Sequence, residues 1–181
     1  MDQGIRPPRG SGFDLCIFIS LPYMNTSMDS LRPGRLAFVQ AGWHAELLDG
    51  ARNAFIERLA ELGVPSNHID CYNVPGAFEI PLFTRRLAQS GHYAAVTGAA
   101  FVVDGGIYRH EFVAQTVIDG LMRVQLETDV PVFSMVLTPH HFREQGESLE
   151  FFARHLAIKG GEVAGACAGM LTALDALVPQ A

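Results

Sequence analysis

The stretch GAAFVVDGGIYRHEFV (residues 98–113) decides the architecture of this chain. Its apolar first half is typical of the end of a buried strand, and the pair Gly105-Gly106 is typical of a turn. The remainder predicts the first turn of a helix carrying Arg109 and His110. Such a turn gathers unpaired N–H groups and the positive end of the helix dipole, which favour anions, and an imidazole exchanges protons near neutral pH. The stretch predicts a phosphate-handling acid/base site; the alternative is an exposed helical turn without a ligand.

The strand-then-helix pattern repeats along the chain. Apolar runs predict strands at residues 35–41, 69–74, 93–100 and 131–137, and apolar residues at helical spacing follow each run. Strands that alternate with helices form parallel sheets covered on both faces. We therefore expect an α/β fold, a three-layer α/β/α sandwich with a four-stranded parallel sheet of the flavodoxin-like kind.

Two details of the helices are also predicted. In the helix that opens at Arg109, the inward side chains are expected to be Phe112, Val113, Val117, Leu121 and Val124. Because glycine is a poor helix former, Gly160-Gly161 is expected to interrupt the last helical region. The helix before the interruption should pack Leu149, Phe152 and Leu156, and the one after it should share a face formed by Val163, Cys167, Met170, Leu174 and Leu177.

The regular pattern begins only after residue 33. Residues 34–181 are expected to form one domain, which suits a chain of 181 residues. Residues 1–33 are expected to be an N-terminal extension, either disordered or the result of a misassigned start. Residues 15–21 form a short apolar patch, but no small-residue cleavage site follows, so a signal peptide is not expected.

Composition argues against several classes of partner. A formal net charge of −6 gives no electrostatic reason to expect nucleic-acid binding or attraction to an anionic membrane. No apolar run approaches the roughly 20 residues that a membrane helix needs. The three cysteines, Cys16, Cys71 and Cys167, lack metal or redox spacing, so we expect reduced packing residues of a cytoplasmic protein. His140-His141 has no partner at ligand spacing, and no metal is expected.

Ligands of parallel α/β sheets bind at the carboxyl ends of the strands. Four segments should therefore share one edge of the sheet: residues 42–44, 74–79, 102–110 and 138–142. Trp43 could stack on a flat heterocycle or merely pack at a helix start. Glu79 could accept hydrogen bonds from a hydroxylated ligand or simply favour the positive helix end.

Four motifs together resemble a known enzyme family. VPGAFEIP (residues 74–81), the stretch at 98–113, PVFSMVLT (131–138) and Lys159-Gly160 resemble 6,7-dimethyl-8-ribityllumazine synthase, in particular a divergent second type found in some bacteria. The resemblance covers about residues 35–177. It implies a condensation of 5-amino-6-(D-ribitylamino)uracil with 3,4-dihydroxy-2-butanone 4-phosphate in riboflavin biosynthesis, with no cofactor and no metal.

The resemblance also implies roles for particular positions. Trp43 matches an aromatic ring that lies against the pyrimidine. Ala77, Phe78 and Glu79 match the turn that holds the ribityl chain and ring, and Phe101, Val102 and Val103 match the strand end beside the pyrimidine. Gly106 and Ile107 match the turn that cradles the phosphate.

The chain departs from the commoner type of the family at several positions. The histidine assigned there to proton transfer is replaced by Arg109, and His110 follows one place later. Arginine stays protonated, so we expect His110 to transfer protons and Arg109 to neutralise phosphate or oxyanion charge. Ser134 stands where the commoner type presents a phenylalanine from the neighbouring subunit. The phosphate-binding arginine before Lys159 has only Arg154 and His155 as nearby candidates.

The family builds its site between the subunits of a pentamer, so the resemblance implies a homo-oligomer, either a pentamer or a decamer of two pentamers. The main expectation is an active synthase. Two alternatives remain at this stage: a flavin- or lumazine-binding paralogue with weak or no activity, and a mainly structural assembly protein.

Overall fold

The computed structural model describes residues 34–107 and 109–177. The expectation for residues 1–33 therefore lies outside the described residues. In the described residues, four strands alternate with four main helices. The alternation of strands and helices is as the apolar pattern predicts. The strands are β1 (Arg35–Ala41), β2 (Ile69–Val74), β3 (Tyr93–Phe101) and β4 (Val132–Leu137). The helices are α1 (Ala45–Glu61), α2 (Ile80–Ala88), α3 (His110–Thr128) and α4 (Gly146–Asp175), with short 3₁₀ helices at Ser66–His68 and Ala77–Glu79.

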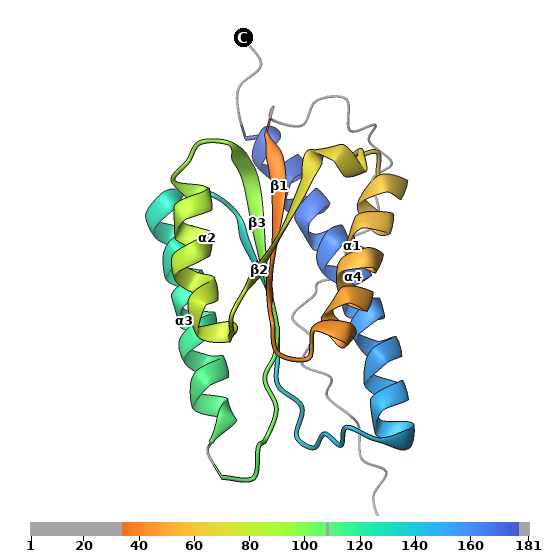
Figure 1. Ribbon diagram of the computed structural model, residues 1–181. Helices are drawn as coiled ribbons and strands as arrows, with labels where there is room; N and C mark the ends of the chain where they lie inside the picture. Colours follow the sequence, from red (N-terminus) through yellow and green to blue (C-terminus); the bar gives the residue numbers. More distant parts are fainter. Residues whose placement is uncertain (1–33, 108, 178–181) are drawn as a thin grey trace, which may run out of the picture.

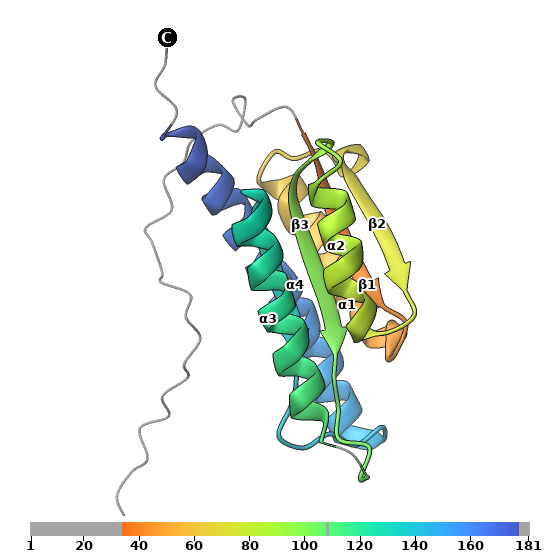
Figure 2. The same cartoon turned by 90° about the vertical axis from the view of Figure 1, so that its left-hand side faces the viewer.

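All strand pairings in the sheet are parallel, and the strand order is β2-β1-β3-β4. Helices α1 and α4 pack together on one face, and α2 and α3 pack together on the other (Figure 1). Turned by 90°, so that the α2–α3 side faces the viewer, α2 and α3 lie in front of the sheet (Figure 2). The expected three-layer α/β/α sandwich with a four-stranded parallel sheet is confirmed. Because the strands are parallel, all four post-strand segments lie beyond one edge of the sheet (Figure 1).

The inward face of α3 differs from the predicted one. Phe112 is 66% exposed and Val113 is 38% exposed, so both face outward. The face that packs on the sheet instead begins at the small Ala114, and it continues through Val117, Leu121 and Val124. The helix carries apolar residues on more than one side. Periodicity alone therefore assigned the wrong residues of the first turn to the buried face.

The predicted interruption at Gly160-Gly161 is also wrong, because α4 runs without a break for 30 residues. Gly160 is buried where α4 crosses α1. A Cβ atom there would lie 2.8 Å from the carbonyl carbon of Ala51, closer than real Cβ atoms approach backbone. The glycine is a packing requirement and not a helix stop.

The buried face of α4 also differs from the predicted one. Leu156, Val163, Cys167 and Leu171 are buried, whereas Leu149 and Met170 are exposed. Leu177 lies beyond the end of the helix and is 77% exposed. Only part of the predicted stripe therefore faces the core.

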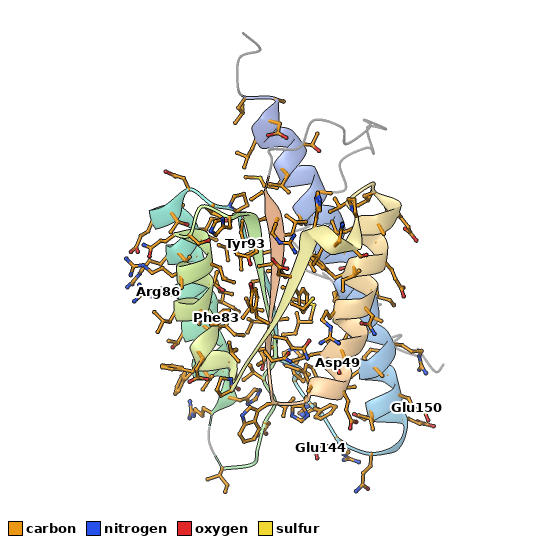
Figure 3. The ribbon with its side chains drawn as sticks, turned by 45° about the horizontal axis from the view of Figure 1, so that its top comes forward. Asp49, Phe83, Arg86, Tyr93, Glu144 and Glu150 are labelled. Carbon is orange, nitrogen blue, oxygen red and sulfur yellow. The ribbon has the colours of Figure 1, made fainter. Side chains whose placement is uncertain are left out.

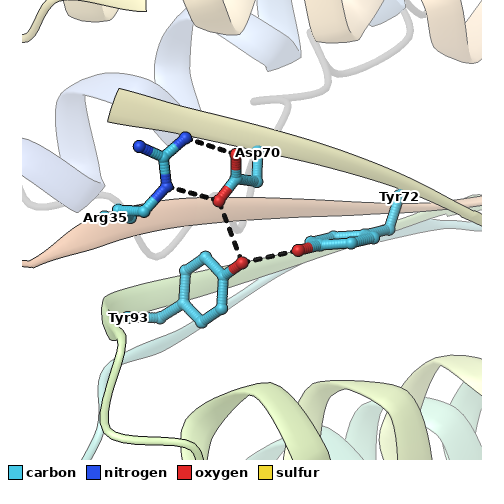
Figure 4. Close-up of polar contacts among 4 residues, drawn as sticks. All are labelled: Arg35, Asp70, Tyr72 and Tyr93. Atoms are coloured by element: carbon cyan, nitrogen blue, oxygen red, sulfur yellow. Dashed lines mark hydrogen bonds and ion pairs between the residues drawn. The ribbon is translucent and has the colours of Figure 1, made fainter. Parts of the chain in front are cut away.

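A polar network of Arg35, Asp70, Tyr72 and Tyr93 lies on β1, β2 and β3, near the residues at which these strands begin (Figure 4). The Arg35 guanidinium donates two hydrogen bonds to the Asp70 carboxylate, and the Tyr93 hydroxyl donates to the same carboxylate at 2.9 Å. The hydroxyls of Tyr72 and Tyr93 lie 2.5 Å apart. The hydrogen bond from Arg35 holds the pKa of Asp70 below its ordinary value, whereas burial raises the pKa of Tyr93. The network ties the first residues of three strands together.

The remaining sequence expectations can be compared directly. Cys167 is buried, and burial raises the pKa of its thiol to about 12. Cys71 is exposed on β2, so the expectation that it is a packing residue is wrong. In residues 34–107 and 109–177, no group of three or more metal-ligating side chains is gathered. No helix in the same part of the chain is long and apolar enough to cross a membrane.

Candidate active site

The connections after β1 and β2 are joined at their backbones. The N–H of Gly42 donates to the carbonyl of Val74 at 2.8 Å, and a Cβ atom at Gly42 would lie 3.1 Å from the carbonyl oxygen of Pro75. Close approach of this kind favours a glycine, because a Cβ atom would crowd the carbonyl oxygen. It places Trp43, the residue after Gly42, beside the 3₁₀ helix Ala77–Glu79.

Trp43 and Glu79 flank the same bare backbone position. A Cβ atom built on Gly76 would lie 3.7 Å from Cδ1 and Nε1 of the Trp43 ring, and 3.1 Å from Oε2 of Glu79. The Trp43 side chain is 73% exposed, and Glu79 is also exposed. Since a packing residue would be covered, the geometry favours an open aromatic platform with a carboxylate beside it.

The other residues of the 3₁₀ helix lie at the same edge. Phe78 is 66% exposed, and Ala77 is half-buried against the core. Glu79 is followed directly by α2, with Pro81 in the first turn of that helix. Proline fixes the backbone and needs no N–H partner there, so the sequence VPGAFEIP produces a short and well-defined turn.

The side chain of Phe101, at the end of β3, is only 3% exposed and lies in a cluster of aromatic rings. Its ring centroid is 5.0 Å from that of Phe142 and 5.3 Å from that of Phe152. Val102 and Val103 are half-buried and continue the chain past the sheet edge, where the Val102 N–H donates to the carbonyl of Leu137 at 2.9 Å. Any contact of Phe101 with a ligand at this edge would therefore be through its backbone.

The glycine turn is stabilised by Asp104, whose Oδ1 accepts a hydrogen bond from the Gly106 N–H at 2.7 Å. Gly106 has a φ of 77°, a left-handed conformation that glycine adopts without strain. Ile107 is 81% exposed. The turn thus leads outward from the sheet before α3 begins.

Arg109 and His110 lie at the start of α3 with different surroundings. Arg109 is exposed, and its guanidinium carbon lies 5.7 Å from the centroid of the Phe112 ring. The His110 side chain is only 13% exposed, and its Nδ1 lies 3.5 Å from Oε2 of Glu111. The two side chains are therefore not equivalent: one presents a fixed charge to solvent, and the other is an imidazole held next to a carboxylate.

Ser134 lies within a strand of the sheet and not at the carboxyl ends of the strands. It pairs with Gly98 in the middle of the outer strand β4, and it is exposed. Its Oγ accepts a hydrogen bond from the Val136 N–H at 3.3 Å. The structure thus brings Trp43, Ala77, Phe78 and Glu79 together, and it places Ser134 away from that group within one subunit.

Sequence patterns did not single out His44. It follows Trp43, begins α1, and packs edge-on against the rings of Phe101 and Phe142. Its position after a predicted strand was the one available signal, because its aromatic partners are distant in the sequence.

Comparisons with known proteins identify the family of this chain. The family model for 6,7-dimethyl-8-ribityllumazine synthase matches residues 33–175. A relative of that name from Rhodococcus erythropolis is 55% identical over 150 residues, covering 83% of this chain and 97% of the relative. Proteins named 6,7-dimethyl-8-ribityllumazine synthase 2 are each 53% identical, one from Pseudomonas syringae pv. tomato (79% of this chain, 84% of the relative) and one from Bradyrhizobium diazoefficiens (82% and 89%). The chain belongs to the 6,7-dimethyl-8-ribityllumazine synthase family.

Proposed function

We propose that this chain condenses 5-amino-6-(D-ribitylamino)uracil with 3,4-dihydroxy-2-butanone 4-phosphate, forming 6,7-dimethyl-8-ribityllumazine, phosphate and water in riboflavin biosynthesis. The observation that carries the proposal is the exposed Trp43 ring, which lies across Gly76 from the Glu79 carboxylate in a chain of this family. A planar pyrimidine and a polyhydroxylated chain need these two kinds of group side by side.

In the proposed site, the Trp43 ring stacks on the pyrimidine. Aromatic stacking on a heterocycle depends on an accessible ring face, and this side chain is 73% exposed. Glu79 accepts hydrogen bonds from the ribityl hydroxyls, and Ala77 and Phe78 border that chain. The backbone beyond Phe101, at Val102 and Val103, borders the pyrimidine edge.

The phosphate is proposed to bind where the glycine turn meets α3. Gly106 and Ile107 contribute backbone, and Arg109 contributes a permanent positive charge. The Asp104 carboxylate already accepts the Gly106 N–H at 2.7 Å, so phosphate must use other donors or displace it. Arg109 is exposed and can reach an anion without a change in the fold.

The chemistry requires proton transfer but no cofactor. An amine attacks a carbonyl carbon and water is lost as an imine forms; the C–O bond to phosphate then breaks, and the second nitrogen closes the ring with loss of another water. Proximity of the two substrates and proton shuttling can supply the rate. His110 is the proposed proton carrier, since an imidazole can both accept and donate near neutral pH.

We also propose a homo-oligomer, a pentamer or a decamer of two pentamers, with Ser134 facing a neighbouring subunit's site. Exposed apolar side chains on one face of α3 support this: Phe112, Met122 and Leu126 are 66%, 52% and 72% exposed. Burial of such a stripe needs a partner surface. The free thiols of Cys71 and Cys167 support a reducing, cytoplasmic setting.

Steady-state formation of the lumazine from the two substrates tests the activity. We expect turnover above the spontaneous rate, and no excess over that rate would contradict the proposal. The alternative, a lumazine- or flavin-binding paralogue, would instead bind the lumazine tightly without forming it. Binding of the lumazine measured alongside turnover separates the two.

A further inference from the structure

His44 combines an unusual backbone with a largely covered side chain. In the described part of the chain, only His44 and Asp129 are non-glycine residues with positive φ, each at 54°. Such a conformation is uncommon and persists where the surroundings hold it. The carbonyl of His44 accepts hydrogen bonds from the N–H groups of Leu47 (3.1 Å) and Leu48 (3.2 Å), which fixes it as the start of α1.

The imidazole of His44 links two elements that are distant in the sequence. Its centroid lies 5.7 Å from the Phe101 ring at an interplanar angle of 82°, and 5.4 Å from the Phe142 ring at 83°. Edge-to-face packing at these separations is favourable. Phe101 ends β3, and Phe142 belongs to the connection between β4 and α4. The ring of His44 therefore joins these two segments to the start of α1.

A third contact reaches the same connection. His44 Nδ1 lies 3.7 Å from Oε1 of Glu144, which stands on the connection before α4, beyond the strand ends (Figure 3). Only 15% of the His44 side chain is exposed, because it is turned into the aromatic cluster. Most of the imidazole is therefore covered by protein atoms, which favours a role that acts through the adjacent residue.

Trp43 is the residue next to His44, and the backbone is held in place both before and after it. Gly42 is hydrogen-bonded to Val74 at the end of β2, and His44 is packed against the end of β3 and the β4–α4 connection. The Trp43 ring itself remains 73% exposed. A ring that is already held in its binding position loses less conformational freedom when a ligand stacks on it.

We propose that His44 is a positioning residue, which holds Trp43 ready for the flat heterocycle of the substrate. The inference rests on the proposed function for the identity of that heterocycle, but not for the positioning itself. Loss of the His44 ring should weaken pyrimidine and lumazine binding about three- to tenfold, the cost of ordering one large side chain.

Two glycine substitutions form a matched pair for the test. His44→Gly keeps the left-handed backbone and deletes the imidazole ring. Asp129→Gly likewise keeps a left-handed backbone and deletes the side chain, but at the end of α3, far from Trp43. Because Trp43 is the one tryptophan in the sequence, the fluorescence anisotropy decay of the protein reports the motion of its ring alone. His44→Asn, which also tolerates a left-handed backbone, serves if the glycine variant does not fold.

We expect faster local motion of Trp43 in His44→Gly, a three- to tenfold rise in the lumazine dissociation constant and in KM for the pyrimidine, and a nearly unchanged kcat and KM for the phosphate substrate. Asp129→Gly should change none of these. In a Trp43→Leu background, His44→Gly should have no further effect on binding. The inference would be overturned if His44→Gly left the motion of Trp43 unchanged. It would also be overturned if His44→Gly weakened binding as much in the Trp43→Leu background as in the parent. If the parent forms no lumazine, the proposed function fails, and the anisotropy decay still decides the positioning role.

Discussion

Gly160 of α4 rests directly on the backbone of Ala51 in α1, with no space for a Cβ atom between them. Residues on both sides of this crossing are buried, among them Ala51 and Leu156. The contact sets how closely α1 and α4 approach each other over one face of the sheet. The start of α1 carries His44, so the crossing also supports the candidate site.

Gly160→Ala should therefore destabilise the fold. The added methyl group must push the helices apart, which costs about 3 kcal/mol, the upper part of the range for overpacked cores. Gly161→Ala is the matched control: a Cβ atom there meets nothing within 4 Å. The control should be neutral or stabilising by up to about 1 kcal/mol, because alanine is the better helix former. Chemical denaturation of both variants checks the pair, and equal midpoints would contradict the packing argument.

The same glycine shows why the fold was predictable only in part. The four strands are short apolar runs between turn residues, so their local pattern was sufficient. Gly160-Gly161 predicted a helix stop because helix propensity describes an isolated helix. Where two helices cross closely, a glycine is favoured because it has no side chain between the two backbones. Phe112 was assigned to the core because it is apolar, although its face of α3 is open within one subunit.

The candidate site, like the fold, was predictable only where the signal was local in the sequence. Trp43, Glu79 and the glycine turn were predicted as site residues because segments that follow parallel strands lie at one end of the sheet. His44 was missed because its role depends on Phe101 and Phe142, which only the folded chain brings to it. No spacing in the sequence records contacts between distant aromatic rings.

Stability at acid pH should depend on Asp70. The hydrogen bond from Arg35 lowers the pKa of this carboxyl group in the folded state, so its contribution is present above the unfolded pKa of about 4. It is lost as the pH falls through the folded value. Asp70→Asn should be less stable than the parent at pH 7, and the difference should shrink at pH 2 to 3.

Denaturation midpoints at both pH values test this dependence. Glu150→Gln is the control, since the ion pair between Glu150 and Arg154 is exposed and 4.0 Å long and should contribute little at any pH. A deficit for Asp70→Asn that stays constant from pH 7 to pH 2 would show that the charge of Asp70 is not the cause.

Replacement of the aromatic platform should weaken binding of the heterocycle. Trp43→Ala is expected to cost about 1 to 3 kcal/mol of pyrimidine binding, the range for bases stacked on aromatic side chains. Trp43→Phe should retain part of the affinity because it keeps a ring. Calorimetric titration with the pyrimidine or the lumazine measures both variants. Unchanged affinity in Trp43→Ala would return this residue to a packing role.

Substitutions of His110 and Arg109 should change different kinetic parameters. His110→Ala is expected to lower kcat about a hundredfold, the scale of general acid and base catalysis, with pyrimidine binding nearly intact. Arg109→Gln removes a charge and should raise KM for the phosphate substrate. The two substitutions are compared by varying each substrate separately. A variant series in which only Arg109 affects kcat would reverse the proposed roles.

The open stripe on α3 should mediate assembly. Leu126 is 72% exposed within one subunit and lies on the same helix face as Phe112 and Met122. Leu126→Lys would place a charge in the proposed interface, where desolvation without a partner is costly, so the assembly should dissociate toward smaller species. Asn53→Lys, on the exposed side of α1, is the control and should leave the assembly unchanged. Light scattering gives the mass of each: a monomeric parent, or a Leu126→Lys variant of unchanged mass, would exclude this stripe as the contact between subunits.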